Sequence, residues 1–414
     1  MTPREAAYCA LLASLRQENF ITHSLEAWQQ KHHPSSLDFA FALEIASGSA
    51  RMALALDHIA AQLSTHQKLS LKLKERALLR TAIYQHYYMD KVPLYAIVNE
   101  TINIGKKYCH RTFVSYLNAM LRQLNVISPT LPTGDSTHNL SVRYSYPEYF
   151  VQQLVKDYGQ ATTIDILNAG NQRPVTMVRL RPGMHLEGDA FRQLTPLKHA
   201  ELPVAICYLQ NVMIDIAASP GCYIQNATPA TLIADLAQLS PTPQRILDLC
   251  ASPGGKLLAA HDAFPQATLY ANDISPDKLQ RLTQNLIKYK TSAQLSCGQG
   301  EDYPTNEQFD IVILDVPCSN SGVLNKRSEA RWRLTPEALQ QLKLTQQKLL
   351  AHASKLINKE GVLWYLTCSI LKEENEQLLA AFCQQHAMRI TYSRTVLPNV
   401  EGWDGGYACL LQKS

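Results

Sequence analysis

The stretch QRILDLCASPGGK, at residues 244–256, gives the clearest indication of the fold of this chain. The apolar run at its start predicts a buried strand, and Gly254 and Gly255 predict a turn into a helix. A backbone without side chains can approach a ligand closely, and the free N–H groups of a helix start favour anionic groups. The stretch matches neither G-x-G-x-x-G nor the P-loop pattern. It predicts a strand–loop–helix unit whose loop binds a ligand.

The same alternation continues to the end of the chain. Helical stretches such as 276–288 and 335–357 separate most of the later apolar runs. Strands that alternate with helices predict a mostly parallel, doubly wound α/β sheet. The runs that we interpret as its strands are Gln244–Cys250, Thr268–Ile274, Ala293–Cys297, Phe309–Val316, Gly361–Ser369, Met388–Ser393 and Tyr407–Gln412.

The front third has a helical pattern instead. Residues 49–92 contain neither Gly nor Pro, and Leu79, Ile83 and Tyr87 lie four positions apart. Such a stripe is typical of contacts between packed helices. Pro, Ser, Thr and Gly are frequent in a later segment, which predicts a linker. The predicted divisions are an all-α bundle at 1–128, a linker at 129–147, a small α+β connecting domain at 148–235 and the sheet domain at 236–414.

Composition limits the class of protein. Of the 414 residues, 46% are hydrophobic and 18% are charged, a balance typical of globular chains. Ten Cys occur without a Cys-x-x-Cys pair, which argues against a zinc site and against a disulfide scaffold. No apolar run reaches roughly 18 residues, and the N-terminus lacks the pattern of a secretory signal. We expect a cytoplasmic protein with no metal and no membrane span.

The excess of positive charge lies at the front of the chain. Residues 1–140 hold 14 Lys and Arg against 10 Asp and Glu, whereas residues 141–414 hold 25 of each kind. This excess would steer an anionic partner such as nucleic acid toward the front third. A solvated surface would also account for so small an excess, so both interpretations stay open.

Three motifs with chemical potential follow three of the predicted strands. They are the loop at 250–256, Asp315 with Cys318, and Cys368. Ligands of open α/β sheets bind beyond the carboxyl ends of the strands, so these motifs should meet at one edge. Asp273 ends the strand after the loop and is placed to hydrogen-bond ribose hydroxyls, although an Asp there can also cap a helix. The residues alone indicate an adenosine-type cofactor beside two thiols.

The wording of these motifs resembles that of a known family. DLCASPGGK, LDVPCS and YLTCS occur in the order typical of the RNA cytosine-C5 methyltransferases, which use S-adenosylmethionine. The front third is similar to the NusB-like helical domain of the bacterial 16S ribosomal RNA methyltransferase B subfamily (RsmB, also called Fmu or Sun). This resemblance covers the whole chain. It implies a Rossmann-like sheet with one antiparallel strand near an edge, S-adenosylmethionine as cofactor and small-subunit ribosomal RNA as partner; we expect a monomer.

The resemblance also implies residue roles. Cys368 would attack C6 of cytosine, because a thiolate bonded there makes C5 a nucleophile. Cys318 would assist release of the methylated base, and Asp315, if protonated or sharing a proton with the ring, would hydrogen-bond the N3 edge of the cytosine. The residues expected to hold the cofactor are Cys250, Ala251, Ser252, Pro253, Gly254, Gly255, Lys256, Asp273, Gln299 and Asp315.

A basic segment follows the first cysteine motif. Residues 325–333, NKRSEARWR, carry four cations, one acid and one aromatic side chain, a composition suited to phosphates and a stacked base. We predict RNA contacts at Lys326, Arg327, Arg331 and Arg333, although a solvated loop could have the same composition. The family usually has a His-Pro turn here and often an acid in place of Gln299, so the path of this loop and the adenine contact are open.

Two alternatives remain from the sequence. The first is the same chemistry on tRNA, because the front domain favours ribosomal RNA only by family analogy. The second is a non-catalytic RNA-binding or assembly protein that keeps the fold, and the presence of both cysteines argues against it.

Overall fold

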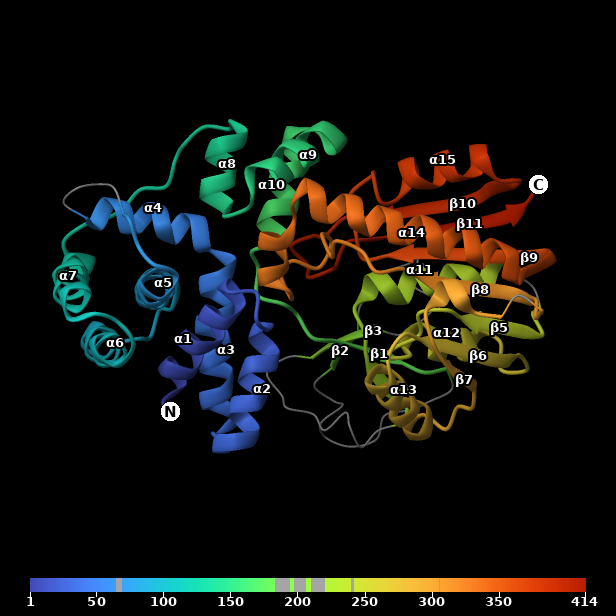
Figure 1. Cartoon of the computed structure of the whole chain (residues 1–414), viewed down its shortest axis with the longest axis horizontal. Coiled ribbons are helices and arrows are strands. Elements are labelled where there is room, and N and C mark those ends of the chain that lie inside the picture. The colour runs from blue at the N-terminus through green and yellow to red at the C-terminus, as the bar shows by residue number, and fades with distance from the viewer. Residues whose placement is uncertain (65–68, 183–193, 197–205, 210–219, 240–241, 305) are drawn as a thin grey trace. The chain divides into compact units, whose positions relative to one another are not determined.

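The chain divides into two compact units, each built from two segments. The computed structural model describes residues 1–64, 69–182, 194–196, 206–209, 220–239, 242–304 and 306–414 (Figure 1). Unit 1 comprises Met1–Asn171 with Leu324–Leu334, and unit 2 comprises Gln172–Val323 with Thr335–Ser414. The chain thus leaves unit 2 after Val323, contributes a short segment to unit 1 and returns to unit 2 at Thr335.

Unit 1 is helical, as the sequence predicted. Side-chain caps begin several helices; the Thr2 hydroxyl, for example, accepts the Glu5 N–H at 3.3 Å, with Pro3 in the first helical turn. The elements are α1 Pro3–Leu15, α2 Ile21–His32, α3 Ser36–Arg51, α4 Ala53–Leu63, α5 Leu73–Tyr88, α6 Leu94–Tyr108, α7 Arg111–Arg122, η1 Gln123–Asn125, α8 Thr137–Tyr144, α9 Glu148–Tyr158, α10 Gln160–Ala169 and the 3-10 helix η5 Ser328–Arg333.

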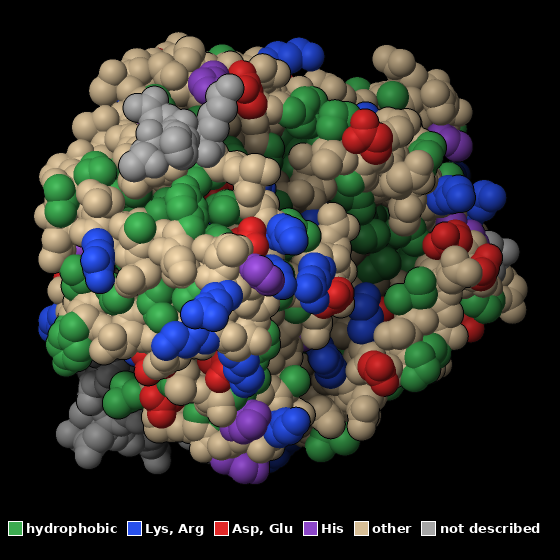
Figure 2. Space-filling view, turned by 60° about the vertical axis from the view of Figure 1, so that its left-hand side comes forward, with side chains coloured by type: hydrophobic (Ala, Val, Ile, Leu, Met, Phe, Trp, Pro, Cys, Tyr) green, Lys and Arg blue, Asp and Glu red, His purple; other side chains and the backbone are tan. Residues whose placement is uncertain are grey.

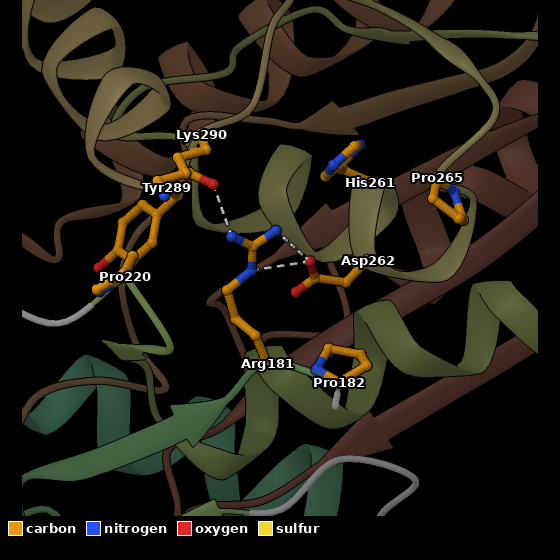
Figure 3. Close-up of a pocket in the computed structure, with 8 residues that line it drawn as sticks. All are labelled: Arg181, Pro182, Pro220, His261, Asp262, Pro265, Tyr289 and Lys290. Carbon is orange, nitrogen blue, oxygen red and sulfur yellow. Dashed lines mark hydrogen bonds and ion pairs between the residues drawn. The ribbon is translucent and has the colours of Figure 1, made fainter. Parts of the chain in front are cut away.

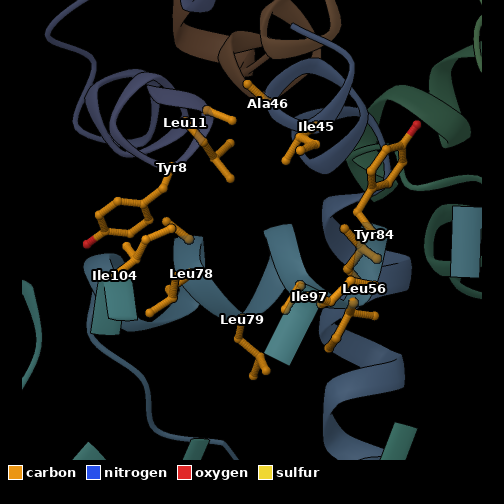
Figure 4. Packing of buried hydrophobic residues seen from close by; sticks show 14 of the residues in the cluster. Tyr8, Leu11, Ile45, Ala46, Leu56, Leu78, Leu79, Tyr84, Ile97 and Ile104 are labelled. Carbon is orange, nitrogen blue, oxygen red and sulfur yellow. The ribbon is translucent and has the colours of Figure 1, made fainter. Parts of the chain in front are cut away.

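Buried side chains of helices α1 to α7 form the core of unit 1, and Figure 4 shows part of it. Leu79 and Ile83 of the predicted stripe are buried there, and Tyr87 packs against the cluster. Helices α3 and α5 approach closely at Gly48, where an added Cβ would lie 1.9 Å from the Tyr84 ring. The stripe therefore marks contacts between helices, as its spacing indicated.

Unit 1 also differs from the predicted division. The segment expected to be a linker contains α8, which begins where the Ser136 hydroxyl accepts the Asn139 N–H at 3.2 Å. Helices α9 and α10 belong to unit 1 and not to a connecting domain, so the compact unit extends to Asn171. The frequent Pro and Ser residues of this segment led to the prediction of a linker, but both residue types also occur at the starts of helices.

The segment 324–334 contains a buried arginine that bonds to three helix ends of unit 1. The Arg331 side chain is fully buried, and its guanidinium donates to the C=O groups of Arg51 at 2.9 Å, Ser145 at 3.0 Å and Gly170 at 3.1 Å. These three carbonyls stand at the C-terminal ends of α3, α8 and α10. Helix C-terminal carbonyls lack partners within their helices and carry partial negative charge, so one cation serves three helix ends. The ring of Tyr146 lies 3.9 Å from the same guanidinium.

Unit 2 contains a seven-stranded sheet with the strand order β10-β11-β9-β8-β5-β6-β7. Neighbouring strands are parallel except where β11 pairs with β9 and β10, which confirms the predicted sheet with one antiparallel strand near an edge. The strands are β5 Arg245–Asp248, β6 Thr268–Asp273, β7 Gln294–Cys297, β8 Phe309–Asp315, β9 Ile357–Thr367, β10 Met388–Val396 and β11 Gly406–Lys413.

Helices cover both faces of this sheet (Figure 1). One face packs against α11 Ala227–Leu239, α12 Gly255–Ala263 and α13 Pro276–Lys288, and the other against α14 Pro336–Leu356 and α15 Glu376–Gln385. The central strands are buried on both faces, which explains their continuous apolar runs. The site motifs, by contrast, follow the carboxyl ends of β5, β6, β8 and β9.

Unit 2 also holds a small antiparallel sheet with the order β2-β3-β1-β4. Its strands are β1 Met177–Leu180, β2 Leu194–Pro196, β3 Ile206–Leu209 and β4 Cys222–Ile224. They lie within residues 148–235, and a separate connecting domain there stays a prediction. Among the helices that the structure describes, none alone has the length and apolarity to span a membrane; α3 and α4 reach that measure only as a pair bent by 82°.

Candidate active site

The loop after β5 is held tightly between its neighbouring strands. Leu249 N–H donates to the Ile313 carbonyl of β8 at 3.0 Å, and Ala251 N–H donates to the Asn272 carbonyl of β6 at 2.9 Å. Gly254 has φ +105°, and a Cβ at this position would lie 2.6 Å from Leu282. Helix α12 begins at the next residue, so its free N–H groups lie beside the loop. The loop therefore has the backbone of an anion- or nucleotide-binding turn.

Asp273 lies against this loop. Its carboxylate accepts the Ser252 N–H at 2.9 Å and the Ile274 N–H at 2.7 Å, and the Lys278 ammonium is 3.2 Å away. Gln299 is exposed just after β7, whose last residue pairs with Asp273 in the sheet. The residues predicted to hold the nucleoside part of a cofactor thus stand on adjacent strand ends, although Asp273 also fixes the loop.

Asp248, at the end of β5, has an unused acceptor. The residue is buried, and its Oδ1 has no hydrogen-bond partner among the described residues. Burial, together with the Asp315 carboxylate, raises the pKa of Asp248 to about 7, against the opposing effect of Lys256. A buried acceptor without a donor is rare and suggests a group that donates to it. The donor set, the glycine turn and the helix start fit a cofactor with a charged amine and a nucleoside.

The two cysteines meet at the same edge. Strands β8 and β9 are parallel neighbours, with Asp315 opposite Leu366, so the residues that follow them lie side by side. The Sγ atoms of Cys318 and Cys368 are 3.1 Å apart. The hydrogen bond with Cys368, followed by burial, raises the pKa of Cys318 well above its usual value. Because the two thiols are in hydrogen-bond contact, the protonation of one affects the other, and they do not behave as two independent core residues.

Lys256 connects the cofactor loop to the thiols. Its ammonium forms an ion pair with Asp315, and it lines, with Cys368, a cavity of about 120 Å³ whose other walls include Thr228, Asp404 and Gly405. Burial opposes the charge on Lys256, but Asp315 and Cys368 outweigh it and raise the pKa of this lysine. One site therefore holds a cation, a carboxylate and two thiols.

Asn320 is a contact that the sequence argument missed. The Cys368 thiol donates to the Asn320 side-chain oxygen at 3.3 Å, and the Asn320 amide donates to the Cys318 carbonyl at 3.0 Å. The residue has φ +60°, a left-handed conformation that Asn tolerates better than most residues. The sequence gives no local signal for this contact, because Asn320 and Cys368 lie 48 positions apart.

The predicted RNA-contact residues fall into two groups. Lys326 and Arg327 are exposed, and Arg333 is half-buried with its guanidinium 4.1 Å from the Phe20 ring. Arg331 is fully buried against helix ends within unit 1, so the prediction of an RNA contact at Arg331 is wrong. On the face drawn in Figure 2, acidic and His side chains lie among the Lys and Arg side chains. The front charge excess therefore does not by itself define an RNA surface.

A larger cavity, of about 540 Å³, lies elsewhere in unit 2 (Figure 3). Arg181 donates to the Asp262 carboxylate at 2.9 and 2.7 Å and to the Tyr289 carbonyl at 2.7 Å. These contacts join the small sheet to α12 and α13, and the cavity contains neither thiol. No cluster of three or more metal-ligating side chains occurs among the described residues, and the absence of a metal stays a prediction.

Known proteins match both parts of the chain. Residues 236–406 match the family described as 16S rRNA methyltransferase RsmB/F, and residues 1–125 match the NusB family. Over residues 236–406, the chain is similar to the RsmB/F methyltransferase family. Ribosomal RNA small subunit methyltransferase B of Photorhabdus laumondii is 29% identical, with 89% of each chain covered, and that of Vibrio cholerae is 28% identical, with 100% of this chain and 98% of the relative covered.

The fold has known examples as well. A crystal structure of the protein PH0851 superposes with a TM-score of 0.79 at 19% identity, covering 100% of this chain and 99% of the other. A methyltransferase homologue from Pyrococcus horikoshii has a TM-score of 0.58 at 19% identity, over 68% of this chain and 100% of the other. The RsmB/F family is one of RNA methyltransferases, which agrees with the loop, carboxylates and thiols at one sheet edge.

Proposed function

We propose that this chain transfers a methyl group from S-adenosylmethionine to C5 of a cytosine in RNA, through a covalent bond between Cys368 and C6 of the base. The observation that carries the proposal is the 3.1 Å contact between the Cys318 and Cys368 sulfurs, beside the Lys256–Asp315 ion pair. Methylation at an oxygen or an exocyclic nitrogen needs no thiol, whereas C5 of cytosine needs nucleophilic activation from C6.

The residues of the site support a reaction in three steps: attack at C6, methylation at C5 and release of the base. The Cys368 thiolate forms a bond to C6, and the electron pair of the C5–C6 double bond becomes available at C5. Asp315 and N3 share a proton, which forms the hydrogen bond between them and offsets the negative charge that develops on the ring. After C5 has taken the methyl group, its proton leaves to water, the double bond re-forms and the C6–S bond breaks. Cys318 donates its S–H to the departing Cys368 sulfur.

The cofactor would lie against the loop at 250–256. S-adenosylmethionine would supply an electrophilic methyl group on a sulfonium. Asp273 and Gln299 would contact its nucleoside, and Asp248 offers its unused oxygen to an amine donor. Lys256 keeps Asp315 oriented toward the base through their ion pair.

We propose small-subunit ribosomal RNA as the substrate, because the relatives that match nearly the full length are named for its methylation. A base must leave its stack to reach these thiols. Lys326, Arg327 and Arg333 are the proposed RNA contacts within the basic segment, and Arg331 is not among them.

The Cys318→Ala variant tests the covalent route. It should still attack and transfer the methyl group but release product slowly, because the departing sulfur loses its S–H donor. A protein–RNA adduct that survives heat and detergent should accumulate and should disappear in the Cys318→Ala/Cys368→Ala double variant. Cys383→Ala, at a half-buried position on α15, is the matched control and should form no adduct. Absence of the Cys318→Ala adduct on an RNA that the parent methylates would contradict the proposed role of Cys318.

A further inference from the structure

Glu374 has a fully buried carboxylate, and among the described residues the groups that donate hydrogen bonds to it are all neutral. Its oxygens accept the Ser319 N–H at 2.9 Å, the Gln346 side-chain N–H at 2.9 Å and the Ser369 hydroxyl at 2.6 Å. Burying a carboxylate without a cation costs several kcal/mol, and hydrogen bonds offset part of that cost. A charge kept in such a place needs an explanation beyond packing.

The donors to Glu374 flank the two thiols in the chain. Ser319 follows Cys318, and Ser369 follows Cys368. Gln346, on α14, also donates to the carbonyl of Pro317 at 3.0 Å, on the other side of Cys318. One carboxylate thus connects both cysteine loops, which belong to different strand ends.

Asn375 extends the same network. Its side-chain oxygen accepts the Thr367 hydroxyl at 2.7 Å, and its amide donates to the Ser369 carbonyl at 2.9 Å. The two residues on either side of Cys368 are therefore both hydrogen-bonded to Asn375, the residue that follows Glu374. The pair Glu374-Asn375 fixes the path of both loops before either thiol meets a substrate.

We propose that Glu374 is a positioning residue for the covalent reaction: it holds the two cysteine loops so that Cys318 and Cys368 stay in sulfur–sulfur contact with the proton on Cys318. This inference rests on the proposed function. Glu374 acts indirectly, by way of the thiols, because it bonds to atoms of the cysteine loops and contacts neither the base nor the cofactor.

The charges around the pair are arranged for this division of roles. Cys318 is faced by Cys368, by Glu374 and by Tyr365, whose hydroxyl donates to the Glu374 carbonyl at 2.8 Å. After the hydrogen bond with Cys368 and burial, the negative charges of Cys368 and Glu374 raise the pKa of Cys318 further. Lys256 faces Cys368 instead, and the charges of Asp315 and Cys368 raise the pKa of this lysine against its burial. A carboxylate stands on the side of the protonated thiol and an ammonium on the side of the nucleophile.

The test uses the full-length protein without RNA and then with RNA. Glu374→Gln keeps the shape and removes the charge, and Glu374→Asp keeps the charge but shortens the bridge between the loops. Glu373→Gln is the matched control, because the neighbouring Glu373 carboxylate pairs with Lys343 at 2.9 Å. Alkylation of Cys318 by iodoacetamide across pH, read by mass spectrometry, reports on the thiol pair independently of catalysis.

Both Glu374 variants should slow single-turnover methyl transfer by roughly ten-fold or more, with the KM for S-adenosylmethionine unchanged. Glu374→Gln should also move alkylation of Cys318 to lower pH, whereas Glu374→Asp and Glu373→Gln should not. Parent-like single-turnover rates in folded Glu374 variants, or failure of both to fold, would make Glu374 a purely structural residue and overturn the inference. An inactive parent with a shifted Glu374→Gln alkylation profile would overturn the proposed function and leave the positioning of the thiols standing.

Discussion

Arg331→Met is the substitution whose consequence differs most between the two interpretations of the basic segment. The buried guanidinium donates to the carbonyls of Arg51, Ser145 and Gly170 and to the side-chain oxygen of Asn171 at 2.9 Å. Burial lowers the pKa of Arg331 to about 10, so the side chain stays charged at neutral pH. Met has a similar length and no donor. The variant therefore leaves the C-terminal carbonyls of three helices without a partner.

The expected loss follows from two opposing effects. Each carbonyl left buried without a donor costs about 1–3 kcal/mol, and the lost contact with the Tyr146 ring costs about 1–2 kcal/mol more. The variant also has no cation to bury, and the absence of that desolvation cost stabilises it by several kcal/mol. The net destabilisation of unit 1 should lie near 3–5 kcal/mol, the range for removing one partner from a buried ionic group.

Native-state hydrogen exchange measures this loss where it should occur. Amides at the ends of α3, α8 and α10 should exchange at least roughly 100-fold faster in Arg331→Met, since each 1.4 kcal/mol is a factor of about ten. Arg333→Met is the control: its guanidinium stacks on Phe20 in a half-buried position and should contribute about 1 kcal/mol or less. Parent-like exchange in Arg331→Met, with a weaker salt dependence of RNA binding, would refute the structural role and restore the RNA contact.

Three further predictions concern unit 2. Asp273→Ala should weaken S-adenosylmethionine binding by about 1–3 kcal/mol through lost hydrogen bonds, and unchanged affinity in calorimetric titration would remove Asp273 from the site. Asp248 has a pKa of about 7 in the folded chain, against its usual value of 3.8. Its contribution to the free energy of unfolding is therefore fully present below pH 3.8 and is lost as the pH rises through 7. In Asp248→Asn, the free energy of unfolding measured with urea should fall less as the pH rises, by up to about 4 kcal/mol. The same pH dependence in the variant as in the parent would show that Asp248 is ionised throughout. Gly254→Ala should impair cofactor binding because its Cβ meets Leu282, and parent-like binding would show that the loop tolerates a side chain.

The sheet and its active edge could be predicted because they depend on patterns that are local in sequence. A run such as 309–315, buried on both faces, must be apolar throughout, and parallel strands place their carboxyl ends together. Once the strands were assigned, Asp273 had to stand beside the loop, and Cys318 beside Cys368.

Other features depend on groups that composition does not reveal. The partners of Arg331 are backbone carbonyls from positions about 160 to 280 residues away, and every residue type carries such a carbonyl. A charged side chain in a polar segment therefore suggested a solvated or RNA-bound loop. Similarly, α8 lies in a segment whose Ser and Pro indicate turns as readily as helix starts. The network around Glu374 was not predictable for the same reason, because its donors include a backbone N–H and come from three separate segments of the chain.

The most direct test of cytosine-C5 chemistry uses RNA labelled with tritium at C5 of cytidine. Methylation at C5 replaces that hydrogen, so tritium should enter water in a one-to-one ratio with methyl groups transferred from S-adenosylmethionine. Cys368→Ala should abolish both signals, and Cys383→Ala should leave both unchanged. Methyl transfer to RNA without tritium release would place the methyl group on another atom and contradict the proposed reaction.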